Sequence, residues 1–173
     1  MRDIKKIVVH CSAGNWGDMA YVDKLHKKRG FVCNGYHFGI LNGYVSYETW
    51  KSHVVDVDKI GKIEHGRPLS MMGAHAEKDN KDSIGVVLFG MAAFHPEQLS
   101  SMFNLFQAIE QEVGHELEIV GHYELESGKK QGKTCPNLDM EEIRSQYCQR
   151  KTDGVLKEPD IDKESVYYGV STA

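Results

Sequence analysis

No run of lysine and arginine residues in the sequence forms a basic stripe, and the formal net charge is −4. Proteins that bind nucleic acid through the phosphate backbone usually carry a basic patch or stripe. The sequence also lacks any segment approaching the roughly 20 apolar residues that cross a bilayer, and it shows no internal repeat or low-complexity tract. These absences argue against a nucleic-acid-binding protein and against membrane insertion.

Cysteine is sparse as well, and the four cysteines are spread along the chain without close spacing. Small secreted domains that depend on disulfides carry denser cysteine patterns, so we expect reduced thiols. The N-terminal residues do not show the apolar segment and small-residue cleavage site of a secretory signal peptide. We therefore expect synthesis in the cytoplasm without a signal peptide, and any action outside the cell would require release or export by other means.

The remaining composition is typical of a folded globular protein. Hydrophobic residues make up 40% and charged residues 27% of the 173 residues, which are ordinary values for such proteins. This length is sufficient for one domain with a substantial core. From about residue 151 the sequence is polar and unpatterned. We therefore expect a domain over residues 1–150, a loosely attached tail over residues 151–173, and a monomer.

Two kinds of hydrophobic pattern alternate along the chain. Short apolar runs typical of buried strands occur at residues 4–9, 83–90 and 117–120, with a shorter candidate at 61–64. Helical spacing extends from Asp18 to Arg29, from Pro96 to Gly114, and from Asp139 onward. Aspartate and proline are both favoured at helix starts. The alternation predicts an α/β protein with a single mixed central β-sheet flanked by helices.

The central part of the chain predicts a hairpin. Residues 35–41 alternate aromatic and aliphatic side chains, as a half-buried strand does. Asn42-Gly43 follows, and this pair is a strong signal for a two-residue hairpin turn. We therefore expect residues 44–47 to return as the second strand of a hairpin.

Two candidate metal ligands follow the apolar run at residues 117–120. His122 comes soon after this run, and Cys135 follows 13 residues later in a polar loop. Imidazole and thiolate are both good zinc ligands. His10, at the end of the first apolar run, is the best candidate for a third ligand, because function collects at the carboxyl ends of strands in such sheets. Strand side chains alternate in direction, so we expect only one of His10 and Cys11 to join the cluster.

Three protein ligands would leave a fourth position for water, which is typical of catalytic zinc. Zinc can then polarise a carbonyl group and supply hydroxide near neutral pH. A thiolate ligand weakens this effect, and Lys133 is well placed to compensate by stabilising an oxyanion. His75 lies between small residues that would allow it close to a substrate. Taken singly, residues of these types at such positions are more often structural than functional.

Several short motifs occur in a recognisable order. They are Val8-Val9-His10, Gly35-Tyr36-His37-Phe38, Gly66-Arg67-Pro68, Gly73-Ala74-His75-Ala76, Asn80, Ser83-Ile84-Gly85-Val86, Gly121-His122 and Lys133-Thr134-Cys135-Pro136. In this order they resemble the zinc-dependent N-acetylmuramoyl-L-alanine amidases. That family shares its fold with peptidoglycan recognition proteins and includes amidase-type phage lysozymes. The resemblance covers about residues 4–148.

The resemblance implies a peptidoglycan hydrolase that cleaves the amide between N-acetylmuramic acid and L-alanine of the stem peptide. A water activated by a single Zn²⁺ per chain would be the nucleophile, and bacterial cell-wall peptidoglycan would be the partner. The residues implied for the site are His10, His122 and Cys135 as zinc ligands, Tyr36 and Lys133 as catalytic residues, and His75, Arg67 and Asn80 as substrate-binding residues.

The chain departs from the family pattern between its second and third motifs. About twenty extra residues, roughly 41–60, replace the tight turn usual in the family, and they contain Tyr44, Tyr47 and Trp50. We expect this insertion to form part of one wall of the substrate groove. The loop between His122 and Cys135 also carries additional polar residues.

Two other interpretations compete with the amidase. The first is a recognition module that binds peptidoglycan without cleaving it, but such relatives typically lose a metal ligand, especially the cysteine. The second is a cysteine hydrolase with Cys135 as nucleophile and His122 as base. This second interpretation needs no His10 and does not account for the order of the motifs.

Overall fold

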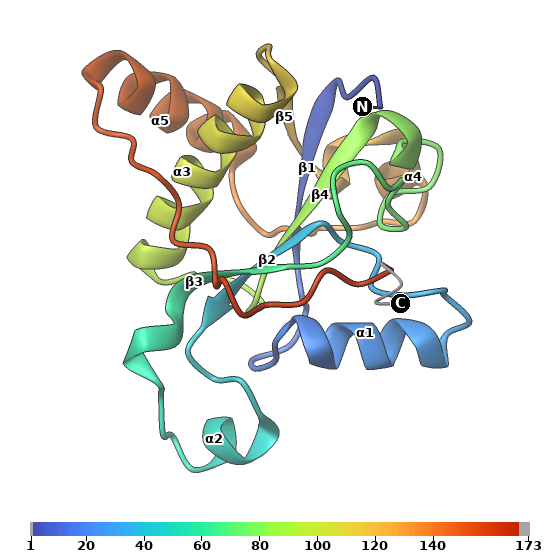
Figure 1. The fold of residues 1–173 in the computed structure, drawn as a ribbon, viewed down its shortest axis with the longest axis vertical. Helices are drawn as coiled ribbons and strands as arrows, with labels where there is room; N and C mark the ends of the chain where they lie inside the picture. Colours follow the sequence, from blue (N-terminus) through green and yellow to red (C-terminus); the bar gives the residue numbers. More distant parts are fainter. Residues whose placement is uncertain (1, 170–173) are drawn as a thin grey trace.

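A mixed sheet of five strands in the order β3-β2-β4-β1-β5 forms the centre of the computed structural model, which describes residues 2–169 (Figure 1). The strands are β1 Lys6–Cys11, β2 Phe38–Asn42, β3 Ile60–His65, β4 Ser83–Leu88 and β5 Glu118–Gly121. Four of them are parallel, and β3 pairs antiparallel with β2 at one edge. The predicted α/β fold with a single mixed sheet is confirmed.

Helices cover both faces of this sheet (Figure 1). The α-helices are α1 Met19–Lys28, α2 Tyr47–Lys51, α3 Pro96–Val113, α4 Glu126–Lys130 and α5 Met140–Asp153. Short 3₁₀ turns occur at η1 Val57–Lys59, η2 Asn80–Asp82 and η3 His122–Glu124. Within residues 2–169, no helix combines the length and apolar character that crossing a membrane requires.

The alternation of side chains along β1 divides the core into two layers. Ile7 and Val9 join the larger cluster, to which α3 and α5 contribute Phe103 and Tyr147. Val8 and His10 point to the opposite face, which α1 and the segments around α4 cover. Because β1 lies between β4 and β5, both of its faces are buried, as the apolar run predicts.

The helix boundaries follow from their capping residues. The Asp18 side chain accepts a hydrogen bond from the Tyr21 amide, and Asp139 accepts from the amides of Glu141 and Glu142. Pro96 is the first residue of α3, and Gly114 ends that helix with a φ of +84°, a conformation that glycine adopts without steric cost. These predicted starts and ends are confirmed.

The predicted hairpin at Asn42-Gly43 is wrong. Gly43 does turn the chain with a φ of +88°, but Ser46 then caps the short helix α2 through a reciprocal capping box with Thr49. The antiparallel partner of β2 is β3, which pairs Phe38 with His65. Residues 43–59 therefore form an excursion between two paired strands, and local turn chemistry does not reveal this long connection.

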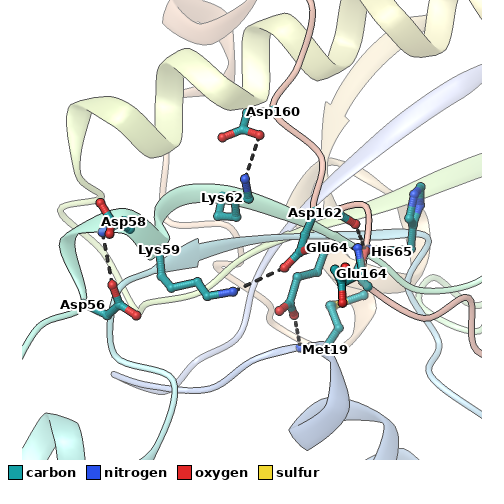
Figure 2. A network of polar contacts seen from close by, with 11 residues as sticks. Met19, Asp56, Asp58, Lys59, Lys62, Glu64, His65, Asp160, Asp162 and Glu164 are labelled. Carbon is teal, nitrogen blue, oxygen red and sulfur yellow. Dashed lines mark hydrogen bonds and ion pairs between the residues drawn. The ribbon is translucent and has the colours of Figure 1, made fainter.

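The C-terminal segment is not loosely attached over residues 155–169. It runs back along the outer edge of β3, where Ile63 donates to the Asp160 carbonyl and accepts from the Asp162 amide. Figure 2 shows the polar network along this edge, including the ion pairs Lys59–Asp162 at 3.2 Å and Lys62–Asp160 at 2.7 Å. The segment thus forms backbone hydrogen bonds with the outer edge of β3. An edge strand covered in this way is less able to pair with strands of other chains. Residues 170–173 of the predicted tail lie outside the described residues.

Candidate metal centre

His10, His122 and Cys135 come together on the face of the sheet that α1 covers. Their ligand atoms all lie within 4.8 Å of one another, so the group could hold a metal ion. The two histidines converge because β1 and β5 are neighbours, with Val9 paired to Gly121. The sequence places both histidines at the ends of apolar runs, and the structure shows that these runs form neighbouring strands.

Cys135 reaches the two histidines through a compact loop. The chain passes from η3 through α4, and a Cβ atom on Gly128 would overlap the His122 carbonyl group, so only glycine allows this close packing. The Cys135 carbonyl then accepts from the Tyr123 amide at 2.9 Å. The Cys135 Sγ accepts from the Cys11 amide at 3.1 Å. The backbone of β1 therefore helps to orient the thiol.

The protonation states favour metal binding, since ligand histidines must be neutral. Burial lowers the pKa of His10 well below its usual value, and the neighbouring His122 adds to this effect. Burial also lowers the pKa of His122, with a further contribution from the positive charge of Lys133. Two neutral imidazoles and a thiol form a donor set that zinc prefers.

Cys11 lies beside this cluster but is not one of its three ligand residues, in agreement with the alternation of side chains along β1. A hydrogen bond with the Cys135 thiol lowers the pKa of Cys11 to about 7. The same hydrogen bond and burial raise the pKa of Cys135. One of the two thiols, Cys11 or Cys135, therefore loses its proton readily. A metal cation at the site would favour the thiolate on Cys135.

His75 lies behind His10 and orients its ring. His75 Nδ1 is 2.9 Å from His10 Nε2, while His10 Nδ1 is 3.8 Å from Cys135 Sγ. His10 therefore presents Nδ1 to the metal position and uses its other nitrogen for a partner, as metal-bound histidines usually do. The His75 ring fits there because Gly85, on which a Cβ would overlap it, carries no side chain. We expected His75 to line the substrate groove. Its contact with His10 instead makes it a residue that positions a metal-binding side chain.

Tyr36 lies directly beside the cluster. Its ring centroid is 5.1 Å from that of His10, and burial raises the pKa of its hydroxyl group. Tyr36 therefore remains protonated and able to donate a hydrogen bond at neutral pH. It precedes β2, where the Asn34 side chain accepts from its backbone amide at 3.0 Å.

Lys133 has a more open environment than Tyr36. Its side chain is exposed, and within residues 2–169 its ammonium group makes no hydrogen bond or ion pair. Its charge is close enough to affect the pKa of His122. The loop holds it through its backbone, whose amide donates to the Gly128 carbonyl at 2.9 Å.

Arg67 and Asn80 do not fit the expected role of substrate contacts. The Arg67 side chain is buried, and its guanidinium group donates to the backbone carbonyls of Asn34, Met72 and Cys33. The Asn80 carboxamide oxygen accepts from the amides of His75 and Ala76. Arg67 thus ties together loops around Tyr36, and Asn80 fixes the backbone of His75. The motif order identifies them as important but cannot distinguish support from contact.

A cavity of about 340 Å³ opens beside the cluster. Tyr36, Ser12 and His26 line its inner end, and Trp16 and Tyr21 line its outer part. Burial lowers the pKa of His26 to about 4, so its ring is neutral at neutral pH, and Arg29 contributes a positive charge to the lining. Larger cavities of about 690 and 490 Å³ lie against α3 and the C-terminal segment, away from the three ligand residues.

Comparisons with known proteins find a matching family and similar sequences. A family model described as N-acetylmuramoyl-L-alanine amidase matches residues 1–138. The endolysin of Escherichia phage T7 is 28% identical over 145 residues, which cover 78% of this chain and 81% of that protein. The endolysin of Enterobacteria phage K11 is 25% identical over 158 residues, covering 81% and 85%.

Solved structures share the fold at lower sequence identity. The N-acetylmuramoyl-L-alanine amidase LysC from Clostridium intestinale URNW aligns with a TM-score of 0.63 and 22% identity, covering 90% of this chain and 88% of that one. A point mutant of the Drosophila protein PGRP-LB, in complex with tracheal cytotoxin, aligns with a TM-score of 0.57 and 22% identity, covering 79% and 76%.

Proposed function

The chain belongs to the N-acetylmuramoyl-L-alanine amidase family and is such an amidase, and we propose that it cleaves peptidoglycan with a zinc ion held by His10, His122 and Cys135. The single observation that carries this proposal is the convergence of two imidazoles and a thiol within 4.8 Å. Three protein ligands leave a fourth position open, as in other catalytic zinc sites.

The bond cleaved is the amide between the lactyl group of N-acetylmuramic acid and L-alanine of the stem peptide. Zinc bound at this site would supply Lewis acidity, polarising the amide carbonyl and lowering the pKa of water. The protein's own residues then orient the reactants. His75 holds the ring of His10 in position through the contact of 2.9 Å.

Tyr36 and Lys133 supply the remaining polar groups. The Tyr36 hydroxyl, whose pKa is raised by burial, donates a hydrogen bond to the developing oxyanion or to the attacking water. Lys133 contributes positive charge at the open side of the site, where its influence on the pKa of His122 reflects its proximity. Both groups strengthen their interactions as negative charge develops on the carbonyl oxygen, which lowers the barrier.

The biological setting follows from the relatives. The T7 and K11 proteins are endolysins, and the similarity over most of both chains supports a role in degrading the bacterial cell wall. The Drosophila structure contains tracheal cytotoxin, which supports a peptidoglycan fragment as the kind of ligand that this chain binds. We propose that the chain acts on cell-wall peptidoglycan as an endolysin-type enzyme.

Metal analysis combined with product analysis tests this proposal. Purified protein should contain about one zinc per chain, and alanine at His10, His122 or Cys135 should abolish both zinc binding and turnover. Mass spectrometry of digested peptidoglycan should show free stem peptides beginning with L-alanine and intact glycan strands. New reducing sugar ends would instead indicate a glycosidase. Activity that persists after chelation and is lost on alkylation of Cys135 would support the cysteine hydrolase.

A further inference from the structure

Four aromatic rings form a continuous surface that joins the metal centre to the 41–60 insertion. The ring centroids of Trp16 and Tyr21 are 4.5 Å apart, those of Trp16 and Tyr47 are 6.1 Å apart, and those of Tyr47 and Trp50 are 5.9 Å apart. We call these four residues the aromatic platform. They come from the β1–α1 loop, the first turns of α1, and α2, and Figure 1 shows α2 beyond the start of α1 at the lower edge of the molecule.

The platform is not part of the hydrophobic core. None of the residues of α2 is buried, and Tyr47 is 44% exposed. Trp16, Tyr21 and Trp50 are half-buried, and a contiguous apolar patch that stays partly open to solvent marks a surface at which something binds. A short helix that buries no side chain gains little for folding from carrying two aromatic residues.

The platform is nevertheless held in a defined position. The Gly17 amide donates to the Tyr44 carbonyl at 2.8 Å, and the Asn42 side chain donates to the Asn15 carbonyl at 2.9 Å. The Asp56 amide donates to the Gly43 carbonyl at 3.0 Å and closes the base of the insertion. These contacts fix the rings before any ligand arrives, which reduces the entropy lost on binding.

The platform is continuous with the candidate active site. Trp16 and Tyr21 line the cavity of about 340 Å³ that reaches Tyr36, which contacts His10. At its other end, Trp50 lines a second hollow of about 300 Å³, next to Asn15 and Asn42. A long ligand with one end at the metal centre could therefore extend over the rings into this second hollow.

We propose that the aromatic platform binds the sugar rings of the glycan strand, and this inference rests on the proposed amidase function. The substrate of that function carries a glycan on one side of the scissile amide and a peptide on the other. Pyranose rings have apolar C–H faces that stack on aromatic rings and polar edges that suit flanking amides. The carboxylates of a stem peptide require cations or hydrogen-bond donors. Over the platform's rings the described residues place one cation, Lys51, 5.7 Å from the Tyr47 centroid, and Arg29 lines the adjoining cavity.

The test is a binding titration of the zinc-loaded wild-type protein with a β-1,4-linked tetramer of N-acetylglucosamine, which has no lactyl amide to cleave. Trp16 and Trp50 are the two tryptophans of the chain, so intrinsic tryptophan fluorescence reports on this surface alone. We expect a saturable change in fluorescence. Tyr47→Leu keeps apolar volume but removes the ring, and it should weaken binding about tenfold while both tryptophans remain as reporters.

The matched control is Val54→Ala, which changes an exposed apolar side chain of the same insertion and should leave affinity unchanged. Replacing residues 44–57 by a short turn should abolish glycan binding and raise the KM for peptidoglycan, with unchanged zinc content. No saturable binding, equal affinity in Tyr47→Leu, or a fluorescence change caused by self-association would overturn the inference. Glycan binding by a protein that releases no stem peptide would support it and would reject only the proposed function.

Discussion

Tyr36 and Lys133 have different surroundings, and this difference separates the effects expected when each is removed. Tyr36 is largely enclosed beside His10, where little water screens its hydroxyl group. Tyr36→Phe should therefore slow turnover about a hundred- to a thousandfold, as the loss of an oxyanion donor does. Zinc content and substrate affinity should change little. Steady-state kinetics and metal analysis would check this, and near-normal turnover would exclude Tyr36 from catalysis.

Lys133→Ala should have a smaller effect, because the ammonium group is exposed and screened by salt. We expect its cost in turnover to shrink as ionic strength rises, which kinetics at two salt concentrations would measure. Lys130→Ala is a matched control, since Lys130 is an exposed lysine of the same loop that pairs with Glu126. An equal, salt-independent loss in both variants would contradict a specific role for Lys133.

His75 provides a prediction about zinc rather than about turnover. Because it orients His10 through their contact of 2.9 Å, His75→Ala should weaken zinc affinity about 10- to 100-fold. Competition with a chromophoric chelator would measure this change. His115→Ala is the control, since His115 is exposed and its ring hydrogen-bonds only the backbone of Glu116 within residues 2–169. Unchanged zinc affinity in His75→Ala would show that β1 alone orients His10.

Among the secondary-structure elements, the C-terminal segment stabilises the edge of the sheet and, through it, α1. β3 carries Glu64, whose carboxylate accepts from the Met19 amide at 2.9 Å at the start of α1 (Figure 2). Residues 160–162 pair with Ile63 on the outer side of the same strand. The polar composition of the C-terminal segment suggests a loose tail. In the structure this segment instead stabilises β3 and, through Glu64, the start of α1, which lines the active-site cavity.

Deleting residues 155–173 should lower the free energy of unfolding by about 2–4 kcal/mol, because backbone hydrogen bonds and the packing of Ile161 are lost. The exposed edge of β3 should also promote aggregation. Urea denaturation and light scattering would measure both effects. Lys62→Met, which removes only the ion pair with the exposed Asp160, should cost less than about 1 kcal/mol. Full stability of the truncated chain would show that residues 1–154 fold independently.

Across the molecule, buried neutral histidines make stability depend on pH. Burial lowers the pKa of His26 to about 4 and that of His37 to about 3. Below about pH 6.5 the unfolded chain takes up protons at these residues, while the folded chain does not until far lower pH. Stability is therefore greatest above about pH 7 and falls as the pH decreases toward the folded-state pKa values.

Urea denaturation of the metal-free protein at pH 7 and pH 5 should therefore show a loss of about 1–2 kcal/mol for each such histidine. Carboxylates contribute little in this interval, because their unfolded pKa values lie near about 4. His26→Gln can still accept from the Gly35 amide that His26 Nδ1 accepts from, and it should reduce the pH dependence. Equal stability at both pH values would contradict neutral burial of these rings.

Much of this protein follows from its sequence because the responsible interactions are local. Apolar runs and helical spacing predict β1, β4, β5 and the long helices, and capping residues such as Asp18 and Asp139 mark where helices start. Ligand chemistry is also a property of residue type, so His10, His122 and Cys135 are candidates on chemical grounds alone. The order of the motifs predicts the fold and the family.

Which distant segments meet is a property of the tertiary structure. β3, and not residues 44–47, pairs with β2, and residues 160–162 pair with β3. Arg67 and Asn80 bind backbone groups instead of facing a groove, and His75 lies behind His10. Cys11 lies beside Cys135, although they are 124 residues apart. Such contacts depend on how loops of many residues close, and no local periodicity or propensity encodes that closure.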